Sequence, residues 1–144
     1  MDNFQKIRVF SRIQAEKFVP PNKYHAWISI TTPGDEVSCI TLRKPYDIGI
    51  KRVQFHDVDN EAWGSDYIVP DNQHAREIYS FMRWNYMAIE ELYVHCDAGI
   101  SRSAGVAAAL SKIFLGSDEE FFKAPYQPNR LIYKLILQIH ENQV

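Results

Sequence analysis

Residues 94–103 of the chain read Val94-His95-Cys96-Asp97-Ala98-Gly99-Ile100-Ser101-Arg102-Ser103. The apolar run 92–94 predicts the end of a buried strand, and the Ala/Val/Leu-rich run 104–115 predicts a buried helix. A strand, a glycine-containing loop and a helix N-terminus together form an anion site, because unpaired backbone N–H groups converge there with the positive end of the helix dipole. The stretch adds a nucleophile, Cys96, and a guanidinium suited to bidentate binding of phosphate, Arg102. It therefore predicts cysteine-dependent phosphoryl transfer.

Length and composition limit the classes of protein that the chain can belong to. Its 144 residues predict one domain. A content of 46% hydrophobic and 24% charged residues is typical of a soluble globular protein and argues against disorder. The formal net charge of −2 gives no electrostatic reason to expect nucleic acid as a partner. Charged residues interrupt the first twenty positions, and no apolar run approaches the roughly 18 residues that cross a bilayer, so we expect neither a signal peptide nor a membrane partner.

The cysteines and histidines bear on redox and metal chemistry. Cys39 and Cys96 are the two cysteines, and no Cys-x-x-Cys spacing occurs, which argues against a disulfide scaffold or a zinc knuckle. We therefore expect a reducing, cytoplasmic compartment. The five histidines are scattered, without a His-x-x-x-His pair, so no metal and no other cofactor is expected. We interpret Cys39 as a small core residue, with a redox role as the alternative.

Hydrophobic patterning predicts strands that alternate with helices. The strands are expected at residues 7–10, 26–30, 37–42, 48–55 and 92–95. The helices are expected from Ser11 to about Phe18, from Pro70-Asp71 to an end near Asn85, at 104–115 with Gly116 as its end, and at about 129–141. This order indicates an α/β domain, with a central, mainly parallel sheet of about four to five strands flanked by helices. The acidic stretch 56–66 is the longest expected loop, and such loops often carry function.

The motif as a whole resembles that of a known family. His95-Cys96-x-x-Gly99-x-x-Arg102-Ser103 matches the signature of protein tyrosine phosphatases and dual-specificity phosphatases. The complete chain resembles the compact dual-specificity-like branch found in bacteria and phages, through the segments 28–31 and 128–131 and through its short length. The resemblance implies that residues 1–144 form a single dual-specificity-like domain with the cysteine-dependent phosphatase fold.

Chemistry assigns roles within the motif. A thiolate at Cys96 would attack phosphorus and form a phosphocysteine, and Ser103 would donate a hydrogen bond to the sulfur when it leaves. Ser103 as a helix N-cap is the plainer alternative. We expect His95 to orient the loop through backbone groups, with direct acid–base work as its alternative. The equatorial oxygens of the transferred phosphoryl group would be held by the Arg102 side chain and by the loop amides. These amides belong to Asp97, Ala98, Gly99, Ile100, Ser101 and Arg102.

A general acid is needed to protonate the leaving oxygen. The resemblance implies an aspartate on a loop after an earlier strand, where the chain offers Asp57, Asp59 and Asp66. Asp57 follows the strand most directly and ranks first, Asp59 ranks second and Asp66 third. Asn129 after Pro128 resembles the position whose side chain braces the phosphate loop, and its alternative is a helix N-cap.

The loop also bears on the substrate. It carries no lysine, and Asp97 adds negative charge at its rim, which disfavours densely anionic inositol phosphates. We expect a phosphorylated protein or peptide as substrate, with phosphotyrosine first and phosphoserine or phosphothreonine second; Trp63 and Tyr67 are candidate aromatic walls. The alternatives are a phosphate-binding module without turnover, a phosphatase of a non-protein ester, and sulfur transfer or arsenate reduction that brings Cys39 to Cys96.

Overall fold

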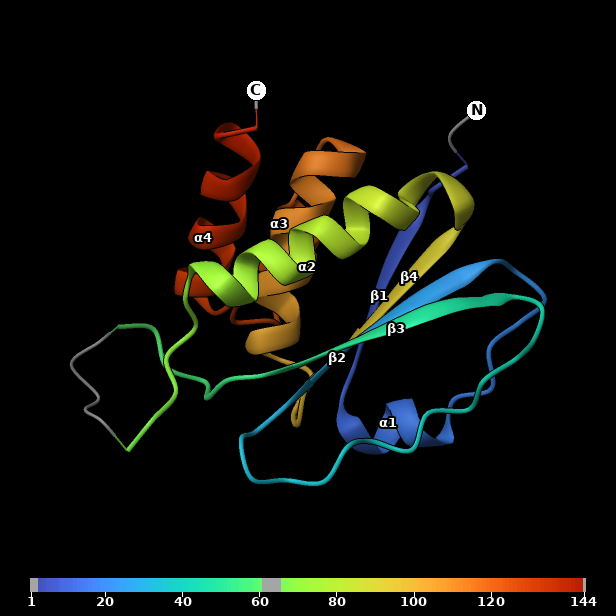
Figure 1. Cartoon of the computed structure of the whole chain (residues 1–144), viewed down its shortest axis with the longest axis horizontal. Coiled ribbons are helices and arrows are strands. Elements are labelled where there is room, and N and C mark those ends of the chain that lie inside the picture. Colours follow the sequence, from blue (N-terminus) through green and yellow to red (C-terminus); the bar gives the residue numbers. More distant parts are fainter. Residues whose placement is uncertain (1–2, 61–65, 144) are drawn as a thin grey trace.

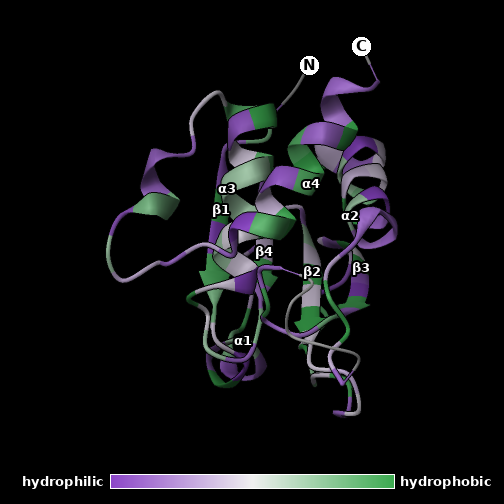
Figure 2. Ribbon diagram, turned by 90° about the vertical axis from the view of Figure 1, so that its left-hand side faces the viewer, coloured by the Kyte–Doolittle hydropathy of each residue, from purple (hydrophilic) through white to green (hydrophobic). Residues whose placement is uncertain are grey.

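Four parallel strands form the central sheet, in the order β1-β4-β2-β3. The computed structural model describes residues 3–60 and 66–143. Its strands are β1 (Lys6–Phe10), β2 (His25–Thr31), β3 (Asp47–Gln54) and β4 (Glu91–His95). Every neighbouring pair is parallel, and the arrowheads of all four strands lie at one end of the sheet (Figure 2). The predicted α/β class and parallel sheet are confirmed.

Helices cover both faces of this sheet. They are α1 (Arg12–Lys17), α2 (Asn72–Asn85), α3 (Arg102–Leu115) and α4 (Arg130–Glu141), with 3₁₀ turns η2 (Tyr86–Ala88) and η3 (Glu119–Phe122). Figure 1 shows α2, α3 and α4 together on one side of the sheet and α1 on the other. Local signals set the helix ends: Ser11 and Asp71 each form a capping box, and Gly116 ends α3 with a φ of 88°.

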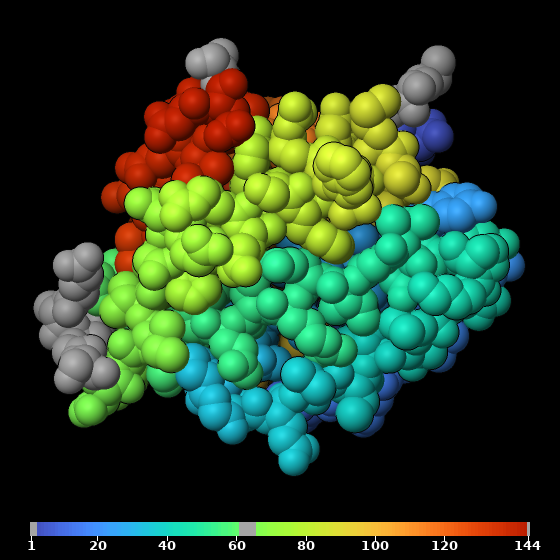
Figure 3. Space-filling model, viewed as in Figure 1, coloured from blue at the N-terminus to red at the C-terminus, as the bar shows by residue number. Residues whose placement is uncertain are grey.

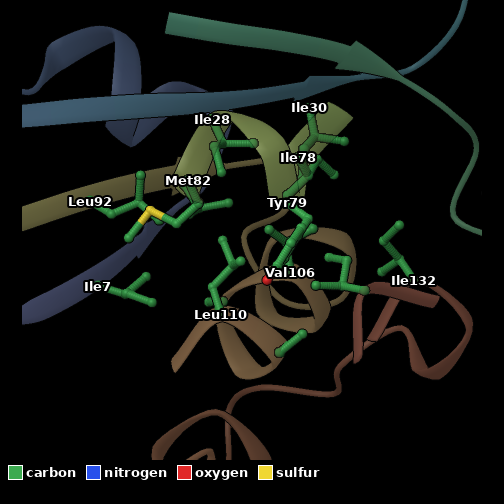
Figure 4. Packing of buried hydrophobic residues seen from close by; sticks show 14 of the residues in the cluster. Ile7, Ile28, Ile30, Ile78, Tyr79, Met82, Leu92, Val106, Leu110 and Ile132 are labelled. Atoms are coloured by element: carbon green, nitrogen blue, oxygen red, sulfur yellow. The ribbon is translucent and has the colours of Figure 1, made fainter. Parts of the chain in front are cut away.

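Two hydrophobic clusters hold these layers together. In the larger one, Ile28 and Leu92 on the sheet pack with Met82 of α2 and Val106 and Leu110 of α3 (Figure 4). The smaller one lies on the opposite face and is formed by Phe10, Ala15, Trp27 and Tyr93. The central strands β2 and β4 are buried along their whole length, which explains the apolar runs 26–28 and 92–94 within them.

The strand expected at residues 37–42 is absent, and that prediction is wrong. The backbone groups of this segment bond to side chains instead of to a neighbouring strand: Arg12 Nη2 donates to Val37 O at 3.1 Å, and Cys39 N donates to Glu16 Oε2 at 2.8 Å. Cys39 is exposed, so its interpretation as a core residue is also wrong. In the space-filling view the connection between β2 and β3 forms the surface next to β3 (Figure 3). Its β-rich composition was overridden by these distant polar partners.

The parallel arrangement brings four chain segments to one end of the sheet. The segments that follow the carboxyl ends of the strands begin at Ser11, Thr32, Phe55 and Cys96. In open parallel sheets this end is the usual place for a ligand. Within the described residues, no helix is long and apolar enough to cross a membrane, and no group of three or more His, Cys, Asp or Glu side chains is placed to hold a metal ion.

Candidate active site

The loop that joins β4 to α3 surrounds the Cys96 thiol. Cys96 is only 2% exposed, and its Sγ lies 3.0 Å from Ser103 Oγ and accepts the N–H of Gly99 at 3.3 Å. Gly99 has a φ of +73°, and a Cβ at this position would lie 2.5 Å from the Ser11 nitrogen. Glycine is therefore required both by the left-handed backbone and by the close approach of the loop to the end of β1.

The backbone of the loop offers donors for an anion. Among the residues that the structure describes, the N–H groups of Ala98, Ile100, Ser101 and Arg102 donate to no protein acceptor. They lie at the N-terminus of the 14-residue helix α3, where the helix dipole is positive. Free amides and a helix N-terminus in one loop are suited to binding phosphate. This matches the site that the motif predicts.

Arg102 is held by the segments that follow two other strands. Its Nη1 donates to Thr32 Oγ1 at 3.0 Å and to the Phe55 carbonyl at 2.9 Å, and its Nη2 donates to Asp97 Oδ2 at 2.9 Å. The guanidinium is buried, so these bonds define its plane. The sequence does not identify Thr32 and Phe55 as residues of the site, because no local pattern links them to Arg102, which lies far along the chain.

Asp97 forms an ion pair within the loop. Burial alone would raise the pKa of Asp97, but hydrogen bonds from Thr32 and Arg102 and the positive charges of Arg102 and Arg12 outweigh it and hold this pKa below its ordinary value. Thr32 Oγ1 lies 2.7 Å from Asp97 Oδ2. The carboxylate is therefore charged at neutral pH and shares one oxygen between Thr32 and Arg102.

Asp57 lies in the same pocket as Cys96. A pocket of about 320 Å³ is lined by Asp57, Cys96, Asp97, Ala98, Ile100, Ser101, Arg102 and Gln127. Asp57 Oδ1 accepts hydrogen bonds from Ser101 Oγ at 2.8 Å and from Asn129 Nδ2 at 3.0 Å. The structure thus brings the first-ranked acid candidate into one pocket with the candidate nucleophile Cys96 and the Arg102 guanidinium.

Asp59, Asp66 and Tyr67 do not line the pocket of Cys96. Asp59 lines a neighbouring pocket of about 330 Å³, which does not include Cys96, and its Oδ1 accepts from Asn60 at 2.9 Å. Asp66 is exposed. The ring of Tyr67 packs edge-on against His56 and does not line the pocket of Cys96. Trp63 lies outside the described residues.

Asn129 is the N-cap of α4, the alternative expected for it, and its side chain contacts the loop of Asp57 instead of the phosphate loop. Its side-chain oxygen caps α4 by accepting the N–H groups of Leu131 and Ile132, each at 3.1 Å. Its side-chain nitrogen donates to Asp57 and to the Val58 carbonyl, so it braces the loop of the acid candidate. Its backbone N–H donates to Ser101 O at 2.9 Å and thereby supports the phosphate loop. Ser103 lies inside α3 and is not its N-cap, a position that Ser101 occupies.

His95 is fully buried in a polar network beneath the loop. Its Nε2 lies 2.8 Å from both Ser29 Oγ and Ser38 Oγ, and its Nδ1 lies 3.4 Å from the Cys96 carbonyl. Arg52 donates to both serine hydroxyls, at 3.4 and 3.3 Å. Burial first, and the charges of Arg12 and Arg52 next, lower the pKa of His95 and keep the ring neutral. The network fits the orienting role expected for His95. Ser29, a polar residue within the apolar run of β2, is the feature of the sequence that could have indicated this buried network.

Comparisons with known proteins bear on the fold. No family model and no curated protein matches this chain. Among solved structures, human DUSP28 matches with a TM-score of 0.65 and 17% identity over 96% of this chain and 93% of its own. The human tyrosine phosphatase-like serine/threonine/tyrosine-interacting protein matches with a TM-score of 0.60 and 17% identity over 95% and 91%. PTPMT1 matches with a TM-score of 0.54 and 20% identity over 95% and 90%.

These similarities extend over nearly the whole of each chain, although only 17–20% of the residues are identical. The shared feature is one small α/β domain with a four-stranded parallel sheet between helices. The expected phosphatase fold is confirmed: the chain has the fold of the dual-specificity phosphatases.

Proposed function

We propose that this protein is a cysteine-dependent phosphatase that hydrolyses phosphate monoesters, with phosphotyrosine of a protein or peptide as its preferred substrate and phosphoserine or phosphothreonine as secondary ones. The observation that carries the proposal is the single pocket shared by the Cys96 thiol, the Arg102 guanidinium and the Asp57 carboxyl group. The free loop amides and the likeness in fold to DUSP28 support it.

In the first step the Cys96 thiolate attacks phosphorus, and the P–S bond forms as the bond to the ester oxygen breaks. Asp57 gives its proton to the departing oxygen. The Asp57 Oδ1 accepts two hydrogen bonds, and within the described part of the chain no donor bonds to Oδ2, so Oδ2 can carry that proton. Arg102 and the loop amides stabilise the charge on the equatorial oxygens.

In the second step Asp57 takes a proton from water as the water oxygen attacks phosphorus. The P–S bond breaks, inorganic phosphate forms, and the sulfur leaves as a thiolate. Ser103 Oγ, at 3.0 Å from the sulfur, is placed to donate a hydrogen bond to this leaving group. His95 supports the loop from beneath as a neutral positioning residue.

Charge in the pocket favours an isolated phosphate monoester over a densely anionic inositol phosphate. With Asp57 protonated as the general acid, the charged side chains of the pocket lining are the Asp97 carboxylate and the Arg102 guanidinium. Two free cysteines are consistent with the reducing, cytoplasmic compartment that we propose for the reaction. The kinship with the bacterial and phage branch stays a prediction.

The main alternative is a phosphate-binding module without turnover. One of the proteins with this fold is itself named a tyrosine phosphatase-like interacting protein. The alternative of sulfur transfer or arsenate reduction has less support, because Cys39 is exposed whereas Cys96 is buried, and both are free.

Hydrolysis of a small aryl phosphate tests the proposal. We expect release of phosphate by the wild type, loss of it in Cys96→Ser, and full activity in Cys39→Ser, which is the matched control at the other cysteine. A wild type that binds a phosphotyrosine peptide but releases no phosphate would establish the binding module instead. Activity that survives in Cys96→Ser would exclude the phosphocysteine mechanism.

A further inference from the structure

The Asp97 carboxylate accepts a hydrogen bond from the Arg102 guanidinium, the side chain that would bind phosphate. A guanidinium has five N–H donors. Three donors of Arg102 are used by Thr32, the Phe55 carbonyl and Asp97, and within the described residues the remaining two, on Nε and Nη2, donate to no protein atom. Bidentate binding of phosphate would therefore use Nε and the free hydrogen of Nη2, whose other hydrogen is bonded to the Asp97 carboxylate.

The charge of Asp97 persists under the conditions in which the site would work. Its pKa is held below the ordinary range of an aspartate by its bonds to Thr32 and Arg102 and by nearby charges, against the opposing effect of burial. Its side chain remains 42% exposed, whereas that of Arg102 is 7% exposed. An incoming ligand therefore meets the negative carboxylate before it reaches the positive group behind it.

We propose that Asp97 is a specificity-determining residue, which competes with the ligand for Arg102 and restricts the site to single, isolated phosphate groups. This inference rests on the anion site of the proposed function and adds a constraint on the substrate class. A ligand with adjacent phosphates brings more negative charge next to Asp97, and the repulsion grows with that charge. An isolated phosphate monoester brings less negative charge than such a ligand, and it can still bind the free loop amides and the two remaining donors of Arg102.

The charge balance of the pocket supports this competition. With Asp57 protonated as the proposed general acid, Asp97 is the charged carboxylate of the lining and Arg102 is its cation. Asp57 bonds to Ser101 and Asn129 and not to Arg102. Asp97 is thus the carboxylate that acts directly on the phosphate-binding guanidinium.

Calorimetric titration with inorganic phosphate and with pyrophosphate tests the inference. The parent is Cys96→Ser, in which no turnover disturbs binding, and Asp97→Asn is added to it. We expect phosphate to bind about 3- to 10-fold more tightly to Asp97→Asn than to the parent, as one unfavourable charge is removed at hydrogen-bond range. Pyrophosphate should gain by a larger factor than phosphate.

The matched control is Asp35→Asn, which removes the same charge from an exposed residue in the turn after Thr32. It should change neither affinity. Equal gains for the two ligands, no gain, or weaker binding by Asp97→Asn would overturn the inference, since Asp97 would then serve only to hold Arg102 in place. Thermal unfolding of each variant checks that the fold is retained.

The two proposals fail in distinguishable ways. Phosphate bound without any hydrolysis by the wild type defeats the proposed function and leaves the specificity role of Asp97 to be judged on the titrations. Hydrolysis by the wild type with no effect of Asp97→Asn defeats the specificity role alone. Absence of phosphate binding in parent and variant defeats both.

Discussion

The side-chain nitrogen of Asn129, the N-cap residue of α4, donates a hydrogen bond to Asp57 Oδ1 at 3.0 Å. This bond links the start of α4 to the loop that follows β3. The two residues are 72 positions apart in the chain. Through this bond the same side chain that caps a helix also positions the candidate acid of the reaction. Several of the expected effects of substitution depend on this double role.

Substitution of Asp57 separates substrates by their leaving group. We expect Asp57→Asn to lower kcat on a phosphotyrosine peptide by about 100-fold or more, because the phenol oxygen then departs without a proton. The loss on p-nitrophenyl phosphate should be much smaller, since its leaving group is stable as an anion. Steady-state kinetics on both substrates measures this. Asp59→Asn is the matched control, and a larger loss in that variant would move the acid assignment to Asp59.

Two substitutions at Asn129 separate its cap from its brace. Asn129→Ser keeps a good N-cap but removes the donor to Asp57, so kcat should fall several-fold while stability changes little. Asn129→Ala removes both, and should also cost about 1–2 kcal/mol of unfolding free energy. Urea unfolding together with kinetics tests this pair. Equal activity of Asn129→Ser and the wild type would show that Asp57 needs no brace from α4.

Gly99 is expected to tolerate no side chain. In Gly99→Ala the new Cβ would lie 2.5 Å from the Ser11 nitrogen and 2.7 Å from the Phe10 carbonyl carbon, and both atoms belong to backbone that cannot swing away. We expect a loss of at least about 2 kcal/mol in stability and loss of phosphate binding.

The control for this substitution is Gly34→Ala. Gly34 also has a positive φ, +94°, but its Cβ would meet no atom within 4 Å. Gly34→Ala should therefore lower stability only by the cost of placing alanine at a positive φ, about 1 kcal/mol. Thermal unfolding of the two variants compares them directly, and equal losses would show that the contact with the end of β1 is unimportant.

Stability should fall as the pH drops below about 6.5, the ordinary pKa of histidine. His95 has a lowered pKa in the folded protein, so below this pH the unfolded chain binds a proton that the native state does not. The stabilisation is complete above pH 6.5 and is lost toward the pKa of the folded state. Asp97 does not contribute to this pH dependence near pH 6.5, because the ordinary pKa of an aspartate is 3.8 and the pKa of Asp97 in the folded protein is lower.

Urea unfolding at pH 7.5 and pH 5.5 measures this dependence. His95→Gln should be less stable at pH 7.5, because it leaves the serine network incomplete, but its stability should change less between the two pH values than that of the wild type. A variant that loses as much stability as the wild type over this interval would assign the pH dependence to other groups.

The parts of the structure that were predicted correctly depend on short stretches of chain. Cys96, Gly99 and Arg102 lie within one loop, and the ends of α1 and α3 follow from the capping residue Ser11 and the positive φ of Gly116. Alternation of apolar runs with helical periods was sufficient to predict the parallel α/β class. In each case the determining contacts lie a few residues apart.

The remaining features depend on contacts between distant segments. The segment 37–42 reads as a strand by composition, but its polar atoms bond to Arg12, Glu16 and Arg52, which the local pattern does not contain. The expectation of a buried Cys39 failed for the same reason.

The sequence by itself predicted the candidate nucleophile, the loop proposed to bind phosphate and the class of fold, because each is encoded by residues that are neighbours in the chain. Only the tertiary structure decided which aspartate meets Cys96 and which groups hold Arg102. Thr32 and Phe55 lie 70 and 47 positions from Arg102, and Asp57 lies 44 positions from Ser101. These pairs meet because parallel strands bring all their carboxyl ends to one edge of the sheet, where segments that are far apart in the chain become neighbours.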